Sequence, residues 1–277
     1  MKSKTKFNVT DKMIRSIVSK HFPGESVNSI EELTEGMFNS AYALWGTGIL
    51  KNGIVLKTSP APGTELLTYE QDILRTETKV YELIKDSPVK IPKILACDFS
   101  HKEIPCDYFF MEHVKGILWK NCLQRISPES RRQLMYELGR RSAVASCENC
   151  LNEIKTPHLV DFDMWAGNIF IDEATCSHIP GIIDFERSFF GDPAADFTSA
   201  MMLFDNVEDE PDFRKGYSEI SIVPLKITDN DRIRMNLYRL YMAVILFVES
   251  YRYDEDYAEM IKGHLNKNIA YLLEELK

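Results

Sequence analysis

The sequence predicts an α+β fold with two lobes, the first rich in strands and the second mainly helical. Short apolar runs bounded by glycines dominate the first part of the chain, and helical periodicity dominates from Pro128 onward. A chain of 277 residues is also long enough for about two domains. We expect an N-terminal lobe over residues 1–111, a connector over 112–116 and a C-terminal lobe over 117–277.

In the N-terminal lobe the pattern predicts a small antiparallel sheet crossed by one helix. Helical spacing of apolar residues alternates there with short runs that end at glycines. The expected helices cover residues 7–21 and 67–85. The expected strands cover residues 34–48, 53–59, 89–98 and 108–112.

In the C-terminal lobe we expect helices interrupted by one hairpin. The helices cover residues 128–147, 194–206 and a pair between 230 and 274. The hairpin consists of two short apolar strands, 168–172 and 181–185, joined by a polar turn. The nine apolar residues 240–248 are too few to cross a bilayer, which takes about 20, so we expect a buried helix there.

The charge and cysteine content restrict the function classes. Lys and Arg number 33 and Asp and Glu 42, a net charge of −9, which argues against non-specific nucleic-acid binding and suits a cationic small substrate or a nucleotide with a divalent metal. The N-terminus lacks the apolar stretch of a secretory signal, and six cysteines are most simply reduced thiols, so we expect a cytoplasmic protein without a membrane segment. Cys147 and Cys150 form a CxxC, but no second pair at metal spacing follows it.

A carboxylate interrupts the apolar face of the helix expected over 67–85. Ile73, Val80 and Ile84 share one face, and Glu77 falls in the middle of it. A buried carboxylate needs a cation, and Lys57 at the end of an apolar strand is the candidate partner. Alternatively, Glu77 reaches water at the edge of the face or pairs with a neighbour on its own helix, Arg75 or Lys79.

The predicted hairpin brings oxygen-bearing side chains together. If Ile169 pairs with Ile183, Asn168 and Asp184 meet at the open end of the hairpin, and Asp163 lies in the loop that leads to it. Such a cluster suits a hard cation such as magnesium, with one carboxylate left as a base. The alternative is structural: Asp163 and Asn168 shape a turn, and Asp184 caps the following helix.

With these residues in place, the sequence resembles the aminoglycoside phosphotransferase and choline kinase-like family, the small-molecule branch of the protein-kinase fold. LVDFDMWAGNIF resembles its catalytic loop, and IPGIIDFERSFFGDPAADF resembles its metal-binding segment. Weaker matches precede them in the right order, LTEGMFNSAYAL for the nucleotide-covering loop and YFFMEHVKG for the hinge. The resemblance runs over about residues 29–200.

This resemblance implies a bilobal kinase-like fold and phosphoryl transfer from ATP, or alternatively GTP, with Mg²⁺. It implies that Lys57 holds the nucleotide phosphates and that Glu77 fixes Lys57. Asn168 and Asp184 would bind magnesium. Asp163 would accept the proton of the substrate hydroxyl as that hydroxyl attacks the γ-phosphorus.

The resemblance also implies roles for residues outside the catalytic loop. The adenine would bond to backbone groups near Glu112 and Val114. Asp196 would brace the catalytic loop by accepting backbone donors. The covering loop would approach the phosphates through Gly36, Asn39 and Ser40.

Two departures from the family bear on activity. Asp161 stands where relatives usually have a histidine that donates a hydrogen bond, which an ionised aspartate cannot do. The segment between the hinge and Asp163 is also short, where relatives carry a helical insert that shapes the acceptor site. These departures allow a second hypothesis, a catalytically weak nucleotide-binding or regulatory module.

The acceptor stays open at the level of sequence. Acidic residues of the C-terminal lobe would attract a cationic molecule such as an aminoglycoside or an amino alcohol, although most such runs are solvated faces. These acids are Glu186, Glu208, Asp209, Glu210, Asp212, Asp254, Glu255, Asp256 and Glu259. Aromatic residues could instead cage choline or belong to the core. These are Trp119, Trp165, Tyr251 and Tyr253.

Overall fold

The computed structural model describes residues 5–34, 38–67, 70–86, 90–145, 158–199, 203–221, 225 and 227–275. The chain divides into two compact units. The first comprises Met1–Lys85 and Pro92–Val114, and the second comprises Asp86–Ile91 and Lys115–Lys277. An antiparallel sheet dominates the first unit and helices dominate the second, which confirms the predicted α+β class.

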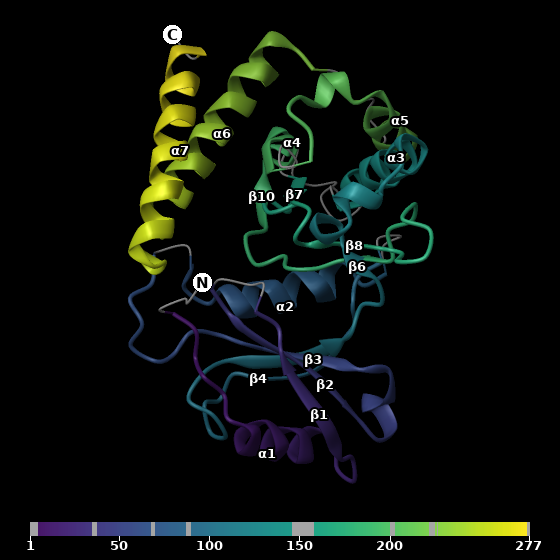
Figure 1. Ribbon diagram of the computed structural model, residues 1–277, viewed down its shortest axis with the longest axis vertical. Coiled ribbons are helices and arrows are strands. Elements are labelled where there is room, and N and C mark those ends of the chain that lie inside the picture. Colours follow the sequence, from purple (N-terminus) through teal and green to yellow (C-terminus); the bar gives the residue numbers. More distant parts are fainter. Residues whose placement is uncertain are drawn as a thin grey trace. The chain divides into compact units, whose positions relative to one another are not determined.

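The first unit is built on a five-stranded antiparallel sheet (Figure 1). Its strand order is β1-β2-β3-β5-β4, and every neighbouring pair is antiparallel. The strands are β1 (Val27–Glu32), β2 (Ser40–Gly46), β3 (Ile54–Thr58), β4 (Ile94–Asp98) and β5 (Tyr108–Glu112). The sequence predicted all of these strands except β1.

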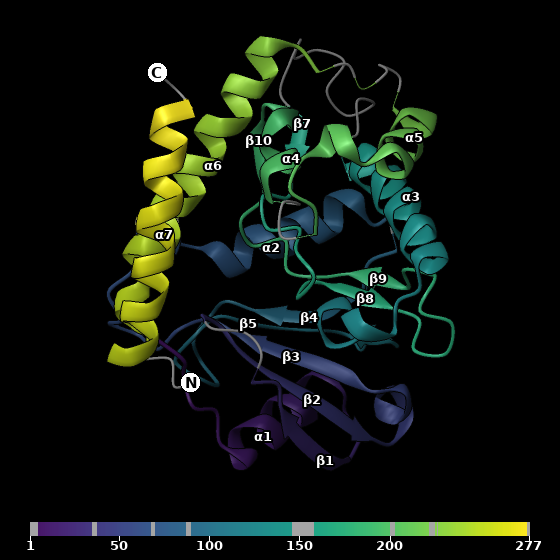
Figure 2. The same ribbon diagram turned by 45° about the horizontal axis from the view of Figure 1, so that its top comes forward.

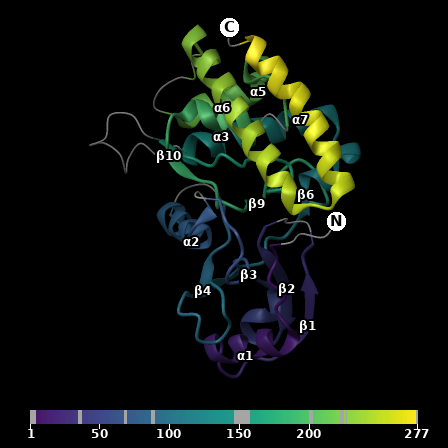
Figure 3. The ribbon, with the colours of Figure 1, turned by 90° about the vertical axis from the view of Figure 1, so that its left-hand side faces the viewer.

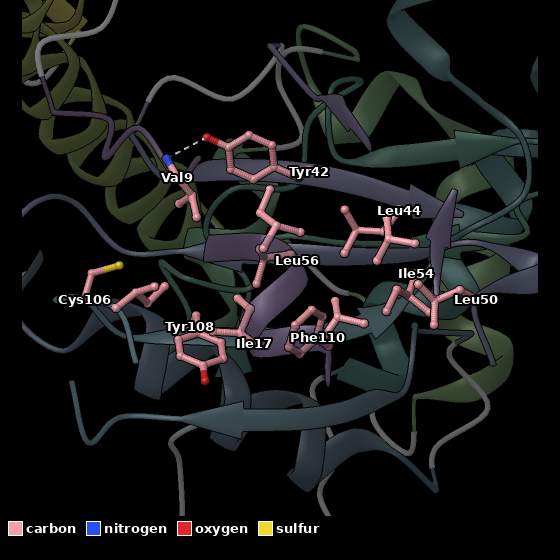
Figure 4. Packing of buried hydrophobic residues seen from close by; sticks show 14 residues of the cluster. Val9, Ile17, Tyr42, Leu44, Leu50, Ile54, Leu56, Cys106, Tyr108 and Phe110 are labelled. Carbon is pink, nitrogen blue, oxygen red and sulfur yellow. Dashed lines mark hydrogen bonds between the residues drawn. The ribbon is translucent and has the colours of Figure 1, made fainter. Parts of the chain in front are cut away.

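One face of this sheet carries the core against α1 (Asp11–His21), which Thr10 caps at its N-terminus. Ile17 of α1 packs in one cluster with Leu56 and Phe110, and Figure 4 shows this cluster, with the backbone N–H of Val9 donating to the hydroxyl of Tyr42. Side chains alternate along a strand, so Lys57 points to the opposite face.

That opposite face is covered by α2 (Ile73–Ile84), so the sheet lies between the two helices of this unit (Figure 3). Tyr81 of α2 meets Phe109 of β5 edge to face, with ring centroids 6.3 Å apart. The predicted apolar stripe is confirmed, because Ile73, Val80 and Ile84 are all buried. The helix begins at Ile73, six residues later than expected from residue 67.

The second unit contains two small sheets (Figure 2). In one, β8 (Ile169–Ile171) lies between β6 (Ile117–Leu118) and β9 (Gly181–Ile182). In the other, β7 (His158–Val160) pairs with β10 (Phe189–Gly191). The predicted hairpin is therefore present as β8 and β9.

Helices make up most of the second unit. They include α3 (Pro128–Ala145), α4 (Asp196–Ser199), α5 (Pro211–Ile220), α6 (Asp229–Glu249) and α7 (Glu255–Glu275). The last two run side by side in all three views, and the sequence predicted both (Figures 1–3). In α5, a Cβ on Gly216 would lie 1.9 Å from the carbonyl oxygen of Tyr136, so a residue without a side chain lets α5 lie directly against α3.

Two predictions about these helices are wrong. Within the described part of the helix expected over 194–206, α4 covers Asp196–Ser199, and residues 203–206 are not helical. The apolar run 240–248 is helical but is buried on one side only: Ala243 is buried, whereas Tyr241 and Val244 are exposed. Cys147 and Cys150 lie outside the described residues. Among the helices that the structure describes, none is long and apolar enough to cross a membrane.

Candidate active site

In the first unit, Lys57 and Glu77 form a buried ion pair. The Lys57 Nζ lies 2.8 Å from Oε2 of Glu77, and the Glu77 side chain is fully buried while that of Lys57 is 10% exposed. Both side chains come from the contact between β3 and α2, where the strand's alternation aims Lys57 at the helix. The expected pairing of Glu77 with Lys57 is thus confirmed over its alternatives.

The other site residues expected in the first unit fall in different surroundings. Asn39 and Ser40 are buried at the start of β2, and the hydroxyl of Ser40 donates to the carbonyl oxygen of Phe7 at 2.7 Å. The backbone N–H of Glu112 donates to the carbonyl oxygen of Lys93 at 3.0 Å, within the sheet. Val114 is the last residue of this unit. Gly36 lies outside the described residues.

In the second unit, the loop between β7 and β8 is held by Asp196. Its Oδ1 accepts the backbone N–H of Asp161 at 2.8 Å and that of Phe162 at 3.1 Å. Phe162 has a φ of 60°, a left-handed conformation that bulky residues adopt rarely, and these two hydrogen bonds support that turn. The Phe162 ring packs edge to face on Phe189 of β10. The loop therefore presents Asp163 from a fixed backbone, and the accepting role expected of Asp196 is observed.

Asn168 joins the end of this loop to Asp163. Its side-chain Nδ2 donates to the backbone carbonyl of Asp163 at 2.9 Å and to the carboxylate Oδ2 at 3.2 Å. Because the nitrogen of the amide is turned toward Asp163, the amide oxygen points the other way. Asn168 thus orients the carboxylate of Asp163, and its own amide oxygen faces away from that carboxylate.

The hairpin register differs by one residue from the prediction. Ile169 pairs with Ile182, not with Ile183, and the backbone N–H of Ile183 donates to the carbonyl oxygen of Asn168 at 2.9 Å. The β8–β9 turn, in which the N–H of Asp172 donates to the carbonyl oxygen of His178, sets this register. Asp184 therefore lies two residues beyond Ile182, the last residue of β9, and its φ of 71° turns the chain out of the strand.

Burial perturbs three carboxyl groups here: Asp161 and Asp163 of this loop, and Asp196, which holds it. Desolvation raises the pKa of Asp163 to about 8, although the charge of Arg187 opposes the rise. Burial likewise raises the pKa of Asp196 to about 7. The pKa of Asp161 is raised well above its usual value, first by burial and then by the charges of Asp196 and Asp163. A site with this spread of carboxyl environments is typical of acid–base chemistry.

Asn168 and Asp184 fit a magnesium ion chemically. Mg²⁺ prefers oxygen ligands and is held in nucleotide sites by one or two side chains together with phosphate oxygens. The amide oxygen of Asn168 is directed away from Asp163, as described above. The carboxylate of Asp184 adds the negative charge that such an ion needs.

Sequence reasoning missed Arg187, which lies beside Asp163, and Glu249, which pairs with Arg187. The Nε of Arg187, on the loop after β9, is 3.9 Å from Oδ2 of Asp163, and Arg187 is itself paired with Glu249 at the end of α6. The signal for Glu249 was its place directly after the apolar run 240–248, since a charge there requires a partner when it is buried. Nothing in the local sequence indicates that the partner is Arg187.

Several residues considered for an acceptor site have other partners. Glu208 pairs with Arg232 at 2.7 Å, and Glu210 pairs with Arg131 at 2.6 Å. The ring of Trp119 is buried, so this residue cannot belong to an open aromatic cage.

Two more rings of the considered cage face cations of this chain. Lys120 lies over Trp165 and Arg252 over Tyr251, at 5.2 and 5.3 Å from the ring centroids. These contacts leave fewer acidic and aromatic groups for a cationic acceptor than the sequence suggested.

Comparisons with solved structures agree with the kinase-like fold that the sequence predicted. The chain is similar to aminoglycoside 2'-phosphotransferase-IIIa in its GDP complex, with a TM-score of 0.68 at 16% identity over 95% of this chain and 99% of that one. The streptomycin–ATP complex of APH(2")-IIa gives a TM-score of 0.60 at 15% identity, covering 97% of both chains. The microcompartment-associated aminopropanol kinase gives 0.60 at 14% identity, covering 96% of this chain and 98% of that one. At such identities these similarities establish the fold.

The family-level match is more local. The model of the phosphotransferase enzyme family matches residues 154–226, which contain Asp163, Asn168 and Asp184. This match confirms the resemblance and the enzyme class, a phosphotransferase, that the sequence indicated. No curated protein matches the chain by sequence.

Proposed function

We propose that this protein is an ATP- and Mg²⁺-dependent phosphotransferase that moves the γ-phosphate to a hydroxyl of a small, cationic molecule. The observation that carries the proposal is the pairing of Asp163 with Asn168 on a loop braced by Asp196. That loop lies within the segment matched by the phosphotransferase family model.

Each residue has a defined task in this proposal. The Asp163 carboxylate accepts the proton of the acceptor hydroxyl, whose oxygen forms a bond to the γ-phosphorus while the bond to the β-phosphate oxygen breaks. Lys57, held by Glu77, neutralises phosphate charge. Asn168 and Asp184 hold Mg²⁺, which supplies charge neutralisation for the transferring phosphoryl group.

The nucleotide contacts are proposed from the family resemblance. Backbone groups near Glu112 and Val114 would bind the adenine. Small residues at the covering loop, including Asn39 and Ser40, would let the backbone approach the phosphates. GTP is the alternative phosphoryl donor.

The ion pairs of the second unit favour an acceptor that carries little charge. A polycationic aminoglycoside needs several free acids, whereas Glu208 and Glu210 are neutralised by arginines. An amino alcohol, with one ammonium group and one hydroxyl, places a smaller demand on the site. We therefore propose amino alcohols ahead of aminoglycosides as acceptors.

Substitutions at Asp163 and Asp184 test separately the proposed proton acceptor and the proposed Mg²⁺ ligand. We expect Asp163→Asn to lower kcat by about 100-fold or more while nucleotide affinity stays close to that of the wild type. Asp184→Asn should abolish the increase in nucleotide affinity that Mg²⁺ gives. Titration calorimetry with ATP, with and without Mg²⁺, and a coupled turnover assay measure these effects.

The exposed-surface variant Glu129→Gln serves as the control and should match the wild type in both assays. Full turnover by both aspartate variants would contradict the assignment.

A second candidate, a nucleotide-binding module with little transfer activity, is favoured by the buried Asp161 in the catalytic loop. It predicts Mg²⁺-dependent binding of ATP without phosphorylation of any acceptor. Substituting Asp161→His would then raise turnover strongly, whereas an active enzyme that tolerates the aspartate would change little.

A further inference from the structure

Arg187 stands between two carboxylates in the second unit. Its terminal NH2 nitrogen lies 2.8 Å from Oε1 and 3.0 Å from Oε2 of Glu249, and its Nε lies 3.9 Å from Oδ2 of Asp163. The Arg187 side chain is 15% exposed and that of Glu249 only 5%. Two carboxylates far apart in sequence are thus linked through one guanidinium.

The two contacts differ in kind. The contact with Glu249 has hydrogen-bond distances, whereas 3.9 Å to Asp163 is an ion-pair distance beyond hydrogen bonding. Glu249 therefore fixes where the guanidinium lies, and the guanidinium acts on Asp163 through its charge. That charge is permanent, because arginine stays protonated in proteins.

The charge of Arg187 reaches the same oxygen that Asn168 holds. Oδ2 of Asp163 accepts from Nδ2 of Asn168 at 3.2 Å and lies nearest to Arg187. Two positive or donating groups on one oxygen orient the carboxylate plane and leave Oδ1 to meet a substrate proton.

Glu249 is itself part of a buried corner. It ends α6, and the short turn that follows contains Ser250 and Arg252, both buried. The Arg252 NH1 nitrogen lies 3.9 Å from Oε1 of Glu249. The corner between α6 and α7 is therefore ordered around the carboxylate that holds Arg187.

We propose that Arg187 is a positioning residue for Asp163, and that Glu249 anchors it, so that the α6–α7 corner sets the geometry of the proton-accepting carboxylate. This inference rests on the proposed phosphotransferase function. It goes beyond that function because it makes the position of Asp163 depend on Glu249, which lies in the C-terminal helices.

The competing explanation is that the Arg187–Glu249 pair merely ties the loop after β9 to α6. A charge swap, Arg187→Glu with Glu249→Arg, distinguishes the two. The swap restores an ion pair between loop and helix, but it places a carboxylate beside Asp163 where a guanidinium stood. If the pair only holds the loop to the helix, the swap should restore kcat. If the positive charge of Arg187 positions Asp163, the swap should not restore kcat.

The experiment compares kcat, acceptor KM and Tm for the wild type, Arg187→Gln, Arg187→Lys and the swapped variant, with an acceptor that the wild type phosphorylates. We expect Arg187→Gln to lose about 10- to 100-fold in kcat, less than removal of Asp163 itself. Arg187→Lys keeps the charge and should recover part of that loss. The swapped variant should regain Tm relative to Arg187→Gln without regaining kcat.

Arg234→Gln is the matched control, because Arg234 of α6 also pairs with a loop carboxylate, Asp192, at 2.6 Å. It should keep kcat within about 2-fold. Recovery of kcat by the swap, or full kcat in Arg187→Gln, would overturn this inference alone. A wild type that phosphorylates no acceptor would overturn the proposed function, and this inference with it.

Discussion

Asp161 is a buried side chain whose two carboxyl oxygens make no hydrogen bond with the described residues. Relatives are expected to place a hydrogen-bond donor there, and an ionised aspartate is not one. Burial and the charges of Asp196 and Asp163 raise its pKa, so the fold favours the uncharged carboxyl more than water does. The order of this loop comes from Asp196, whose carboxylate accepts the backbone N–H groups of Asp161 and Phe162, and not from a hydrogen bond donated by Asp161.

This explanation predicts a specific pH dependence of stability. Folding raises the pKa of Asp161, and that of Asp196 to about 7, so these two carboxyls hold more protons in the folded state than in the unfolded state above pH ~4. Their contribution to the free energy of unfolding should therefore fall as pH rises from about 4 through 7. Asp161→Asn removes one of these ionisations and should reduce the fall.

Thermal unfolding of the wild type and Asp161→Asn at about pH 5 and pH 8.5 measures this effect. The variant should gain Tm over the wild type at the higher pH and little at the lower. Glu129→Gln, at an exposed position, should follow the wild-type profile. Parallel profiles for wild type and Asp161→Asn would show that Asp161 keeps an ordinary pKa.

At the residue scale, the sequence was most informative where local rules demand a partner. Glu77 in an apolar stripe required a cation, and Lys57 supplies it at 2.8 Å. Arg187 and Glu249 obey the same rule, but they are 62 residues apart and lie in segments whose packing no local pattern determines. The Arg187–Glu249 pair was therefore missed because of its separation in sequence, although its chemistry is the same as that of the Lys57–Glu77 pair.

Among the elements, α2 and β3 provide the clearest link between packing and the proposed function. The Lys57–Glu77 pair is buried on one face of the sheet, and the main core cluster of this unit lies on the opposite face. The pair is therefore desolvated but is not part of that core cluster. Breaking such a pair leaves one buried charge uncompensated.

We expect Lys57→Met to lower the free energy of unfolding by about 3 kcal/mol, because Glu77 would remain buried and unpaired. The double substitution Lys57→Met with Glu77→Leu should recover most of this stability and still lack ATP affinity. Urea unfolding and nucleotide titration measure the two effects separately. If the double variant were as unstable as the single one, the pair would not be the source of the loss.

The elements that the sequence missed have weak local signals. β1 has mostly polar residues and is held by its pairing with β2, which is a tertiary effect. In α5, Pro211 and Gly216 resemble helix breakers, yet the proline lies in the first turn and the glycine is required by the close approach to α3. The hairpin register was missed by one residue because turn geometry, not side-chain pattern, sets it.

For the whole molecule, the fold class could be predicted because strand-like and helical patterns separate along the chain. The composition of each unit agrees with that division. The acceptor could not be predicted in the same way, since it depends on which acids are neutralised by arginines, and those pairs join distant elements such as α6 and the segment around Glu208.

The central claim is that the chain transfers a phosphoryl group to a small hydroxyl compound, and direct detection of the product tests it most simply. The purified protein is incubated with ATP, Mg²⁺ and a panel of amino alcohols, choline, aminoglycosides and sugars, and the acceptors are analysed by mass spectrometry. We predict a phosphorylated amino alcohol that forms with the wild type and not with Asp163→Asn. Binding of ATP and Mg²⁺ without any phosphorylated acceptor would contradict the claim.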